Sequence, residues 1–172
     1  MAYTSASTNL KALQMSKTTR ATQFLDKARV SYDTVTYEYD PDADRIGMQA
    51  AEAIGAEPAR VLKTLMAEVD GKAVCVVVPS DHEVSMKKLA AAFGGKSAAM
   101  MKPADAERAT GYHVGGISPF GQKKRVPTVF ERAAIGHDTV FMNGGQRGLQ
   151  VCLKPADAVK ALDAKVAPVT AD

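Results

Sequence analysis

Residues 110–128 read TGYHVGGISPFGQKKRVPT, and this stretch decides how the rest of the chain is interpreted. It places four glycines and two prolines around Ser118, and the cations Lys123, Lys124 and Arg125 follow. Glycine allows close backbone approach, so such a loop can gather N–H donors around an oxyanion or a phosphate. The three cations favour an anionic partner beside the loop, although a short charge run is also typical of an ordinary solvated surface.

Two familiar glycine-rich loops do not fit this stretch. Gly116 and Gly121 have the spacing of a Walker A loop, but Gln122 stands where that motif needs a lysine. Ser118 cannot form a nucleophile elbow, because Pro119 lacks the N–H that would help to build the oxyanion hole. Two interpretations stay open, a structural turn and a ligand-binding loop.

Length, composition and charge limit the classes to which this protein can belong. With 172 residues, of which 46% are hydrophobic, the chain is long enough to bury the core of one domain. A formal charge of +3 is too mild for a general nucleic-acid coat, and DNA is not an expected partner. The longest apolar run, 73–78, is too short to cross a membrane, and residues 1–20 lack the apolar segment of a signal peptide. We therefore expect a cytoplasmic protein without a membrane partner.

The cysteines and histidines show no metal-ligand spacing. Cys75 and Cys152 form no C-x-x-C pair and the three histidines are scattered, so we expect neither a metal ion nor another cofactor. Each cysteine stands in an apolar strand pattern, which favours a small core residue over a nucleophile.

Hydrophobic spacing predicts alternating short elements. Helices are expected at 20–29, 46–54 and 85–93, after Pro103 and after Pro155, and strands at 35–39, 61–69, 72–78, 126–130, 139–142 and 149–153. Asp70-Gly71 is a strong signal for a type I′ hairpin. Because hairpins dominate, we expect an α+β fold with a mixed, mostly antiparallel sheet packed by helices.

Four segments resemble one family in the same order. They are TYEYD at 36–40, RVLKTLMAE at 60–68, the 110–128 loop, and NGGQRGLQV at 143–151. Together they are similar to the YbaK/EbsC-type aminoacyl-tRNA deacylases, relatives of the editing domain inserted in bacterial prolyl-tRNA synthetases. The resemblance implies one domain at 20–172 with a barrel-like sheet of six to seven strands. Residues 1–19 are rich in Ser, Thr and Lys, so we expect them to form a flexible extension.

Lys63 is the first candidate catalytic residue. In the strand 61–69 it shares its phase with Val61 and Leu65, so the pleat points it toward an apolar face. A lysine there must find a carboxylate, carbonyls or a ligand, or else extend to water. The resemblance favours the functional interpretation, because Lys63-Thr64-Leu65 reproduces the segment that carries the functional lysine of these deacylases.

The resemblance also implies the other site residues. Gly115 and Gly116 match the loop glycines whose amides hold the ester carbonyl and the developing oxyanion, and Tyr37 matches a tyrosine of the aminoacyl pocket. Other expected substrate-binding residues are Ile46, Thr64, Gly111, Ser118, Asn143, Gly144, Gly145, Arg147 and Gln150, and Lys123, Lys124 and Arg125 are expected to contact tRNA. A structural alternative stays open for Tyr37 as a core tyrosine, for the glycine-rich segments as ordinary turns, and for the three cations as a solvated face. Gln150 and Ile46 depart from the Asp and the aromatic residue of some relatives, which leaves the recognised amino acid open.

The implied reaction is hydrolysis of mischarged cysteinyl-tRNA that carries the proline anticodon. A synthetase that selects a small amino acid by size excludes cysteine poorly, which makes a separate editing step sensible. No Ser-His-Asp, Cys-His or paired-carboxylate constellation is evident, and a cysteine substrate's own thiolate can attack its ester. The alternatives are an alanyl-tRNA deacylase that activates a water, and a non-catalytic module that delivers tRNA to prolyl-tRNA synthetase. The expected partners are the aminoacyl-tRNA and that synthetase.

Overall fold

The computed structural model describes residues 18–172, so most of the extension expected at 1–19 lies outside the described part of the chain. The helices are α2 Arg20–Lys27, α3 Ile46–Ile54, α4 Met86–Ala92, α5 Pro103–Thr110 and α6 Pro155–Leu162, with short 3-10 turns at Pro58–Arg60 and Arg132–Gly136. The strands are β1 Asp33–Thr36, β2 Leu62–Val69, β3 Lys72–Pro79, β4 Ala98–Met100, β5 Thr128–Glu131, β6 Val140–Asn143, β7 Leu149–Leu153 and β8 Lys165–Ala167. The predicted α+β class is confirmed. None of the helices within 18–172 is long and apolar enough to span a bilayer.

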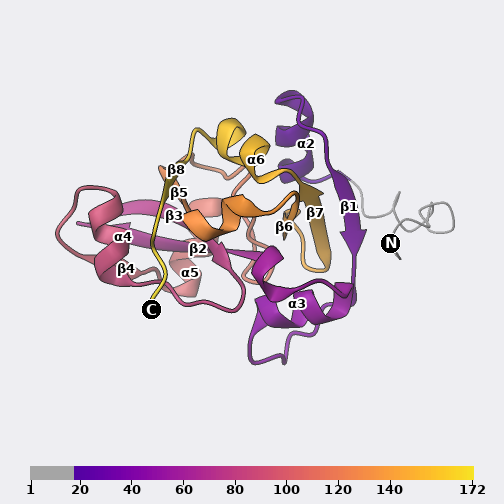
Figure 1. Ribbon diagram of the computed structural model, residues 1–172, viewed down its shortest axis with the longest axis horizontal. Helices are drawn as coiled ribbons and strands as arrows, with labels where there is room; N and C mark the ends of the chain where they lie inside the picture. The colour runs from indigo at the N-terminus through magenta and orange to yellow at the C-terminus, as the bar shows by residue number, and fades with distance from the viewer. Residues whose placement is uncertain (1–17) are drawn as a thin grey trace, which may run out of the picture.

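The strands form two sheets, one of five strands in the order β4-β2-β3-β5-β8 and one of three in the order β1-β7-β6. Pairing is mostly antiparallel, as expected, and the parallel strand pairs are β3 with β5 and β5 with β8. Figure 1 shows α4 and β4 at one end of the molecule and β1, β7 and α2 at the other.

The two sheets meet at one isolated parallel bridge, between Val61 and Phe141. We expected one barrel-like sheet of six to seven strands, whereas residues 18–172 form two sheets without a closed barrel. The ladder does not extend before Val61, because Pro58–Arg60 turn as a 3-10 helix there. The sheets therefore stay distinct, and residues of both line one cavity.

Turn and cap chemistry explains the element ends. Asp70 and Gly71 have φ values of 50° and 82°, as a type I′ hairpin requires. Ser85 caps α4 by accepting the Lys88 N–H. Phe120 of the 110–128 loop is fully buried in the main core, so this loop is anchored by packing rather than lying loosely on the surface.

Candidate active site

A cavity of about 390 Å³ lies between the two sheets, the start of α3 and the loop 114–117. Seven expected site residues line it: Tyr37, Ile46, Lys63, Thr64, Gly115, Asn143 and Gln150. The lining also includes residues that the sequence did not single out, among them Asp44, Arg45, Gly47, Ser80, Glu83, Met100 and Met101. These residues stand outside the four matched segments and are brought together by the fold, so no motif or spacing in the sequence pointed to them.

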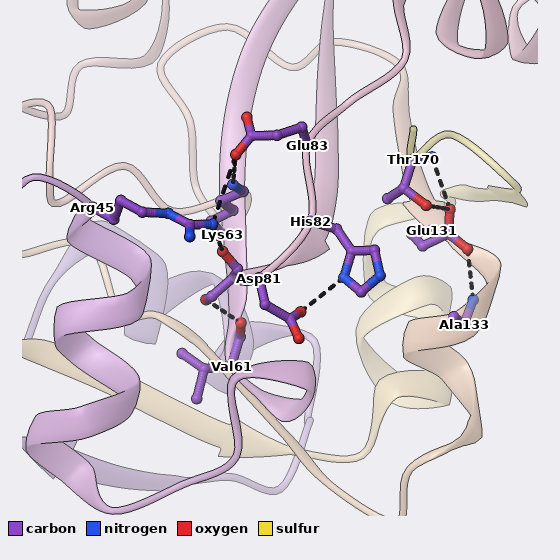
Figure 2. A network of polar contacts seen from close by, with 10 residues as sticks. Arg45, Val61, Lys63, Asp81, His82, Glu83, Glu131, Ala133 and Thr170 are labelled. Atoms are coloured by element: carbon purple, nitrogen blue, oxygen red, sulfur yellow. Dashed lines mark hydrogen bonds and ion pairs between the residues drawn. The ribbon is translucent and has the colours of Figure 1, made fainter. Parts of the chain in front are cut away.

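Lys63 lies on β2, and 19% of its side chain is exposed. Its Nζ is 3.5 Å from Oε2 of Glu83, and Nη2 of Arg45 is 3.8 Å from the same oxygen. Figure 2 shows the two cations directed at this carboxylate. Leu65 and Ala67, on the same strand phase, pack in an apolar cluster, which confirms the predicted orientation of this face. The Glu83 side chain is 73% exposed, so the partner of this half-buried lysine is a loosely held surface carboxylate.

The start of α3 lies directly against β2. A Cβ on Gly47 would lie 2.9 Å from Ser80 Oγ and 3.6 Å from Lys63 Cβ, so a larger residue would push the helix away from the lysine. Ser80 Oγ donates to the Val61 carbonyl, which ties the loop after β3 to the start of β2. Arg45, the residue before α3, donates to the Ser80 carbonyl at 3.4 Å. Arg45 and the first residues of α3 therefore both line the cavity.

Two buried polar atoms of the lining, Thr64 Oγ1 and Gln150 Oε1, have no hydrogen-bond partner within residues 18–172. Buried polar atoms nearly always have one, so the two atoms point to a polar ligand in the cavity. Gln150 is only 4% exposed. Tyr37 lies beside it, and burial raises the pKa of the Tyr37 hydroxyl while a hydrogen bond from Gln150 opposes the rise.

Gly115 and Gly116 differ in their surroundings. Gly115 lines the cavity with φ at 91°, and a Cβ there would collide with the Tyr39 hydroxyl, so only glycine fits. The Gly115 N–H meets no acceptor among the described residues. The Gly116 N–H instead donates to the His113 carbonyl at 2.7 Å, inside the loop itself.

The second glycine-rich turn, 143–148, packs directly on this loop. Asn143 Nδ2 donates to the Gly115 carbonyl at 3.1 Å, and its Oδ1 accepts the N–H of Gly145 at 2.7 Å. The Gly144 carbonyl accepts a hydrogen bond from Thr19 Oγ1 at 2.6 Å. Asn143 reaches the cavity, whereas Gly144 and Gly145 shape the turn behind it.

Arg147 joins the same two segments from outside. Its Nε donates to the Val114 carbonyl at 2.9 Å, and its guanidinium lies over the Tyr39 ring at 5.3 Å from the centroid. Tyr39 was not predicted as a site residue, because the TYEYD match pointed to Tyr37 alone. Both tyrosines belong to the site region, one in the lining and one behind Gly115.

Gly111 and Ser118 lie outside the cavity lining. Gly111 ends α5 with φ at 82°, and a Cβ there would lie 2.7 Å from the Arg20 guanidinium. Ser118 is fully buried, and its Oγ accepts the Phe120 N–H at 3.1 Å. Both residues shape the loop, and direct substrate contact by either stays a prediction.

The cations Lys123, Lys124 and Arg125 are all exposed. The Lys123 N–H donates to the Thr110 carbonyl at 2.8 Å, which holds the run beside the end of α5. Arg125 lines a second cavity of about 70 Å³, whose lining shares no residue with that of the larger one. Contact of these cations with tRNA stays a prediction.

The cavity lining offers charge and hydrogen-bond donors but contains no histidine or cysteine. Both cysteines are free and buried, as predicted, and burial raises the pKa of Cys75 to about 12. Residues 18–172 contain no group of three or more His, Cys, Asp or Glu side chains that could hold a metal ion. This arrangement can position a small ester and polarise its carbonyl.

Known proteins share both sequence and fold with this chain. Residues 40–161 match the family model of the aminoacyl-tRNA editing domain. The Enterococcus faecalis (strain ATCC 700802 / V583) protein named "Putative Cys-tRNA(Pro)/Cys-tRNA(Cys) deacylase EbsC" is 34% identical over 88% of this chain and 93% of its own length. The Escherichia coli (strain K12) protein named "Multifunctional Ser/Thr-tRNA deacylase ProXp-y" is 25% identical over 82% of this chain and 85% of its own length. A crystal structure of "a putative trans-editing enzyme for prolyl tRNA synthetase" has the same fold, with a TM-score of 0.75 and 21% identity over 89% of this chain and 96% of that one.

The cavity and the matched segments define an enzyme of the aminoacyl-tRNA deacylase class. The chain belongs to the aminoacyl-tRNA editing domain family. The family predicted from the four sequence segments is therefore confirmed.

Proposed function

We propose that this protein removes cysteine from mischarged Cys-tRNA(Pro) in trans, and that the substrate thiol takes part in the reaction. The observation that carries this proposal is a cavity with a half-buried lysine and two unpartnered polar atoms but no histidine or cysteine in its lining. A substrate that brings its own nucleophile needs only position and charge from the protein. The relative named for Cys-tRNA(Pro) and Cys-tRNA(Cys) supports the same choice.

In the proposed reaction the thiol loses its proton to water and the sulfur attacks the carbonyl carbon of its own ester. The bond from that carbon to the ribose oxygen breaks, the oxygen takes a proton from water, and the amino acid leaves as a thiolactone that water then opens. The positive charge of Lys63 favours the thiolate and anchors the substrate. The unengaged Gly115 N–H is the proposed oxyanion donor. The engaged Gly116 N–H would support it by holding the loop.

Two other functions compete with this proposal, and the tRNA panel described below distinguishes all three. An alanyl-tRNA(Pro) deacylase would need an activated water in this cavity, and a non-catalytic module would bind tRNA without cleaving it. We place the reaction in the cytoplasm, with prolyl-tRNA synthetase as a partner that could deliver the substrate and with residues 20–172 as one catalytic domain.

The test is a panel of tRNAs carrying the proline anticodon and charged with cysteine, alanine, serine, threonine or proline. We expect fast release of cysteine alone, with and without the synthetase. Release of alanine alone would support the water-activating alternative. Binding of all five tRNAs without release of any amino acid would support the delivery module and contradict the proposal.

A further inference from the structure

The Glu83 carboxylate lies close to two cations, Arg45 and Lys63, that line the cavity with it (Figure 2). One oxygen, Oε2, is 3.5 Å from Lys63 Nζ and 3.8 Å from Arg45 Nη2. Close charge-assisted hydrogen bonds are shorter, roughly 2.7–2.9 Å, so neither cation holds the carboxylate tightly. Arg45 and Glu83 are also well exposed, at 52% and 73% of their side chains.

The backbone of Glu83 is held firmly, in contrast to its side chain. Its carbonyl accepts the Ala171 N–H at 2.8 Å, and the next residue, Val84, forms an antiparallel bridge with Thr170. Thr170 is itself anchored, because its N–H donates to the buried Glu131 carboxylate at 3.1 Å. The Glu83 side chain can therefore swing into water without any movement of the main chain.

We propose that Arg45 and Lys63 form an anion subsite for the last phosphodiester before the aminoacylated end of tRNA, and that Glu83 occupies this subsite when no RNA is bound. The inference rests on the proposed function, because it assumes an aminoacyl-tRNA ester in the cavity. Glu83 then acts as an internal competitor that keeps two neighbouring cations compensated in the free protein.

The chemistry of the substrate fits this position. Only one ribose separates the ester from the nearest phosphate, so an aminoacyl group inside the cavity places that phosphate at the mouth. A guanidinium can donate two parallel hydrogen bonds to two phosphate oxygens. The single contact of 3.8 Å between Arg45 and Glu83 leaves this capacity unused. Asp44 also lines the cavity and is exposed, so the subsite depends on the two cations and not on a broad positive field.

The test uses binding of an uncharged acceptor-stem RNA hairpin that ends in CCA, because binding does not require catalysis. We expect Glu83→Gln to lower the Kd by about two- to fivefold, the range set by the loss of an exposed ion pair. Arg45→Ala should raise the Kd by about three- to tenfold and reduce the slope of log Kd against log salt by about 0.7. Glu52→Gln and Arg132→Ala, which change exposed charges outside the cavity lining, are the matched controls.

A second probe carries a methylphosphonate, which has no charge, at the last internucleotide linkage. We expect it to weaken binding to the wild type and to Glu83→Gln, and to weaken binding to Arg45→Ala to a smaller extent, because that variant has already lost one of the two cations that contact this phosphate. Weaker or unchanged RNA binding by Glu83→Gln overturns the proposal, as does an equal effect of the methylphosphonate on wild type and Arg45→Ala. Failure to cleave Cys-tRNA(Pro) would overturn the proposed reaction but leave these binding results intact.

Discussion

Asn143 Nδ2 donates a hydrogen bond of 3.1 Å to the carbonyl oxygen of Gly115, and this bond joins two glycine-rich turns that stand 28 residues apart in the chain. The same amide accepts the N–H groups of Gly145 and Gln146 through its Oδ1. One side chain therefore fixes the position of the loop that carries the proposed oxyanion donor.

Replacement of Asn143 should damage catalysis and stability together. Asn143→Ala leaves one carbonyl and two N–H groups without their partner, and each buried unsatisfied group costs about 1–3 kcal/mol. We expect kcat/KM for deacylation to fall by about tenfold or more, because small displacements of catalytic donors are costly. Gln146→Ala, at an exposed side chain of the same turn, is the control and should leave both quantities near wild type. An active Asn143→Ala would show that the loop holds its geometry without this bond.

Substitution of Gly115 tests whether the lack of space for a side chain, and not only the positive φ, requires glycine at this position. Gly115 and Gly71 both have positive φ, 91° and 82°, but only a Cβ on Gly115 meets another group within 4 Å. Gly71→Ala should cost only about 1–2 kcal/mol of unfolding free energy from the left-handed backbone. Gly115→Ala should also displace Tyr39 and lower turnover.

Gly116→Val and Ser118→Ala test whether activity depends on the geometry of the loop or on Ser118 as a nucleophile. We expect Gly116→Val to lower turnover, because a Cβ there would lie 2.9 Å from the Arg147 backbone nitrogen. Ser118→Ala should be the mildest change, since its Oγ only accepts the Phe120 N–H. An inactive Ser118→Ala, with a trapped acyl-enzyme in the parent protein, would replace the proposed mechanism.

Lys63→Ala should remove deacylation and leave the protein folded. Its ammonium is half buried beside one exposed carboxylate, so its loss removes a substrate anchor without breaking a tight ion pair. We expect turnover to fall about a hundredfold or more, and unfolding free energy to change by less than about 1 kcal/mol. Lys87→Ala, an exposed lysine on α4, is the matched control. Near wild-type turnover in a folded Lys63→Ala protein would exclude a catalytic role.

Glu131 should make the folded protein sensitive to acid. Burial alone would raise its pKa, but N–H donors from Ala133, Val169 and Thr170 outweigh burial and hold the pKa below its usual 4.5. The folded state then binds fewer protons than the unfolded chain, so this contribution is present above about pH 4.5 and is lost as pH falls through the folded-state pKa. Denaturant unfolding at pH 3.5 to 7 should show a flatter pH dependence for Glu131→Gln than for wild type. The exposed Glu68→Gln should keep the wild-type slope.

Most of the fold could be predicted from local chemistry. The Asp70-Gly71 turn lies where the sequence placed it, and the expected helices at 46–54 and 85–93 correspond to α3 and α4. The strands β4 and β8 were missed, because three residues at a sheet edge are too few for an alternating pattern. The division into two sheets depends on a single bridge between distant residues, which no local pattern encodes.

Apart from Ile46, the lining residues that were predicted all stand in one of the four matched segments. Lys63, Gly115 and Gln150 meet in one cavity although they come from three separate segments. Arg45 and Glu83 were missed because their importance arises from their approach to Lys63, which is a tertiary property. Conversely, Gly111 and Ser118 belong to a matched segment but are not part of the cavity lining, since a motif marks loop shape as well as substrate contact.

The choice between cysteine and serine should separate substrate-assisted chemistry from water activation. The two side chains are nearly the same size, so the cavity should bind both, but a hydroxyl is far less acidic than a thiol. No histidine or cysteine lines the cavity to activate the hydroxyl. We therefore expect Cys-tRNA(Pro) to be cleaved, while the same tRNA charged with serine resists cleavage and acts as a competitive inhibitor.

Three measurements decide this prediction: turnover of the two charged tRNAs, inhibition of cysteine release by the serine-charged tRNA, and the chemical form of the first cysteine product. Thiolactone should be present at the earliest times and give way to free cysteine, because the ester carbon bonds to sulfur before it meets water. Lys63→Ala should abolish thiolactone and free cysteine together, since both come from one attack. Comparable turnover of the serine-charged tRNA would contradict the mechanism and agree with the relative named as a Ser/Thr-tRNA deacylase. Free cysteine with no early thiolactone would also contradict it, because water would then be the nucleophile.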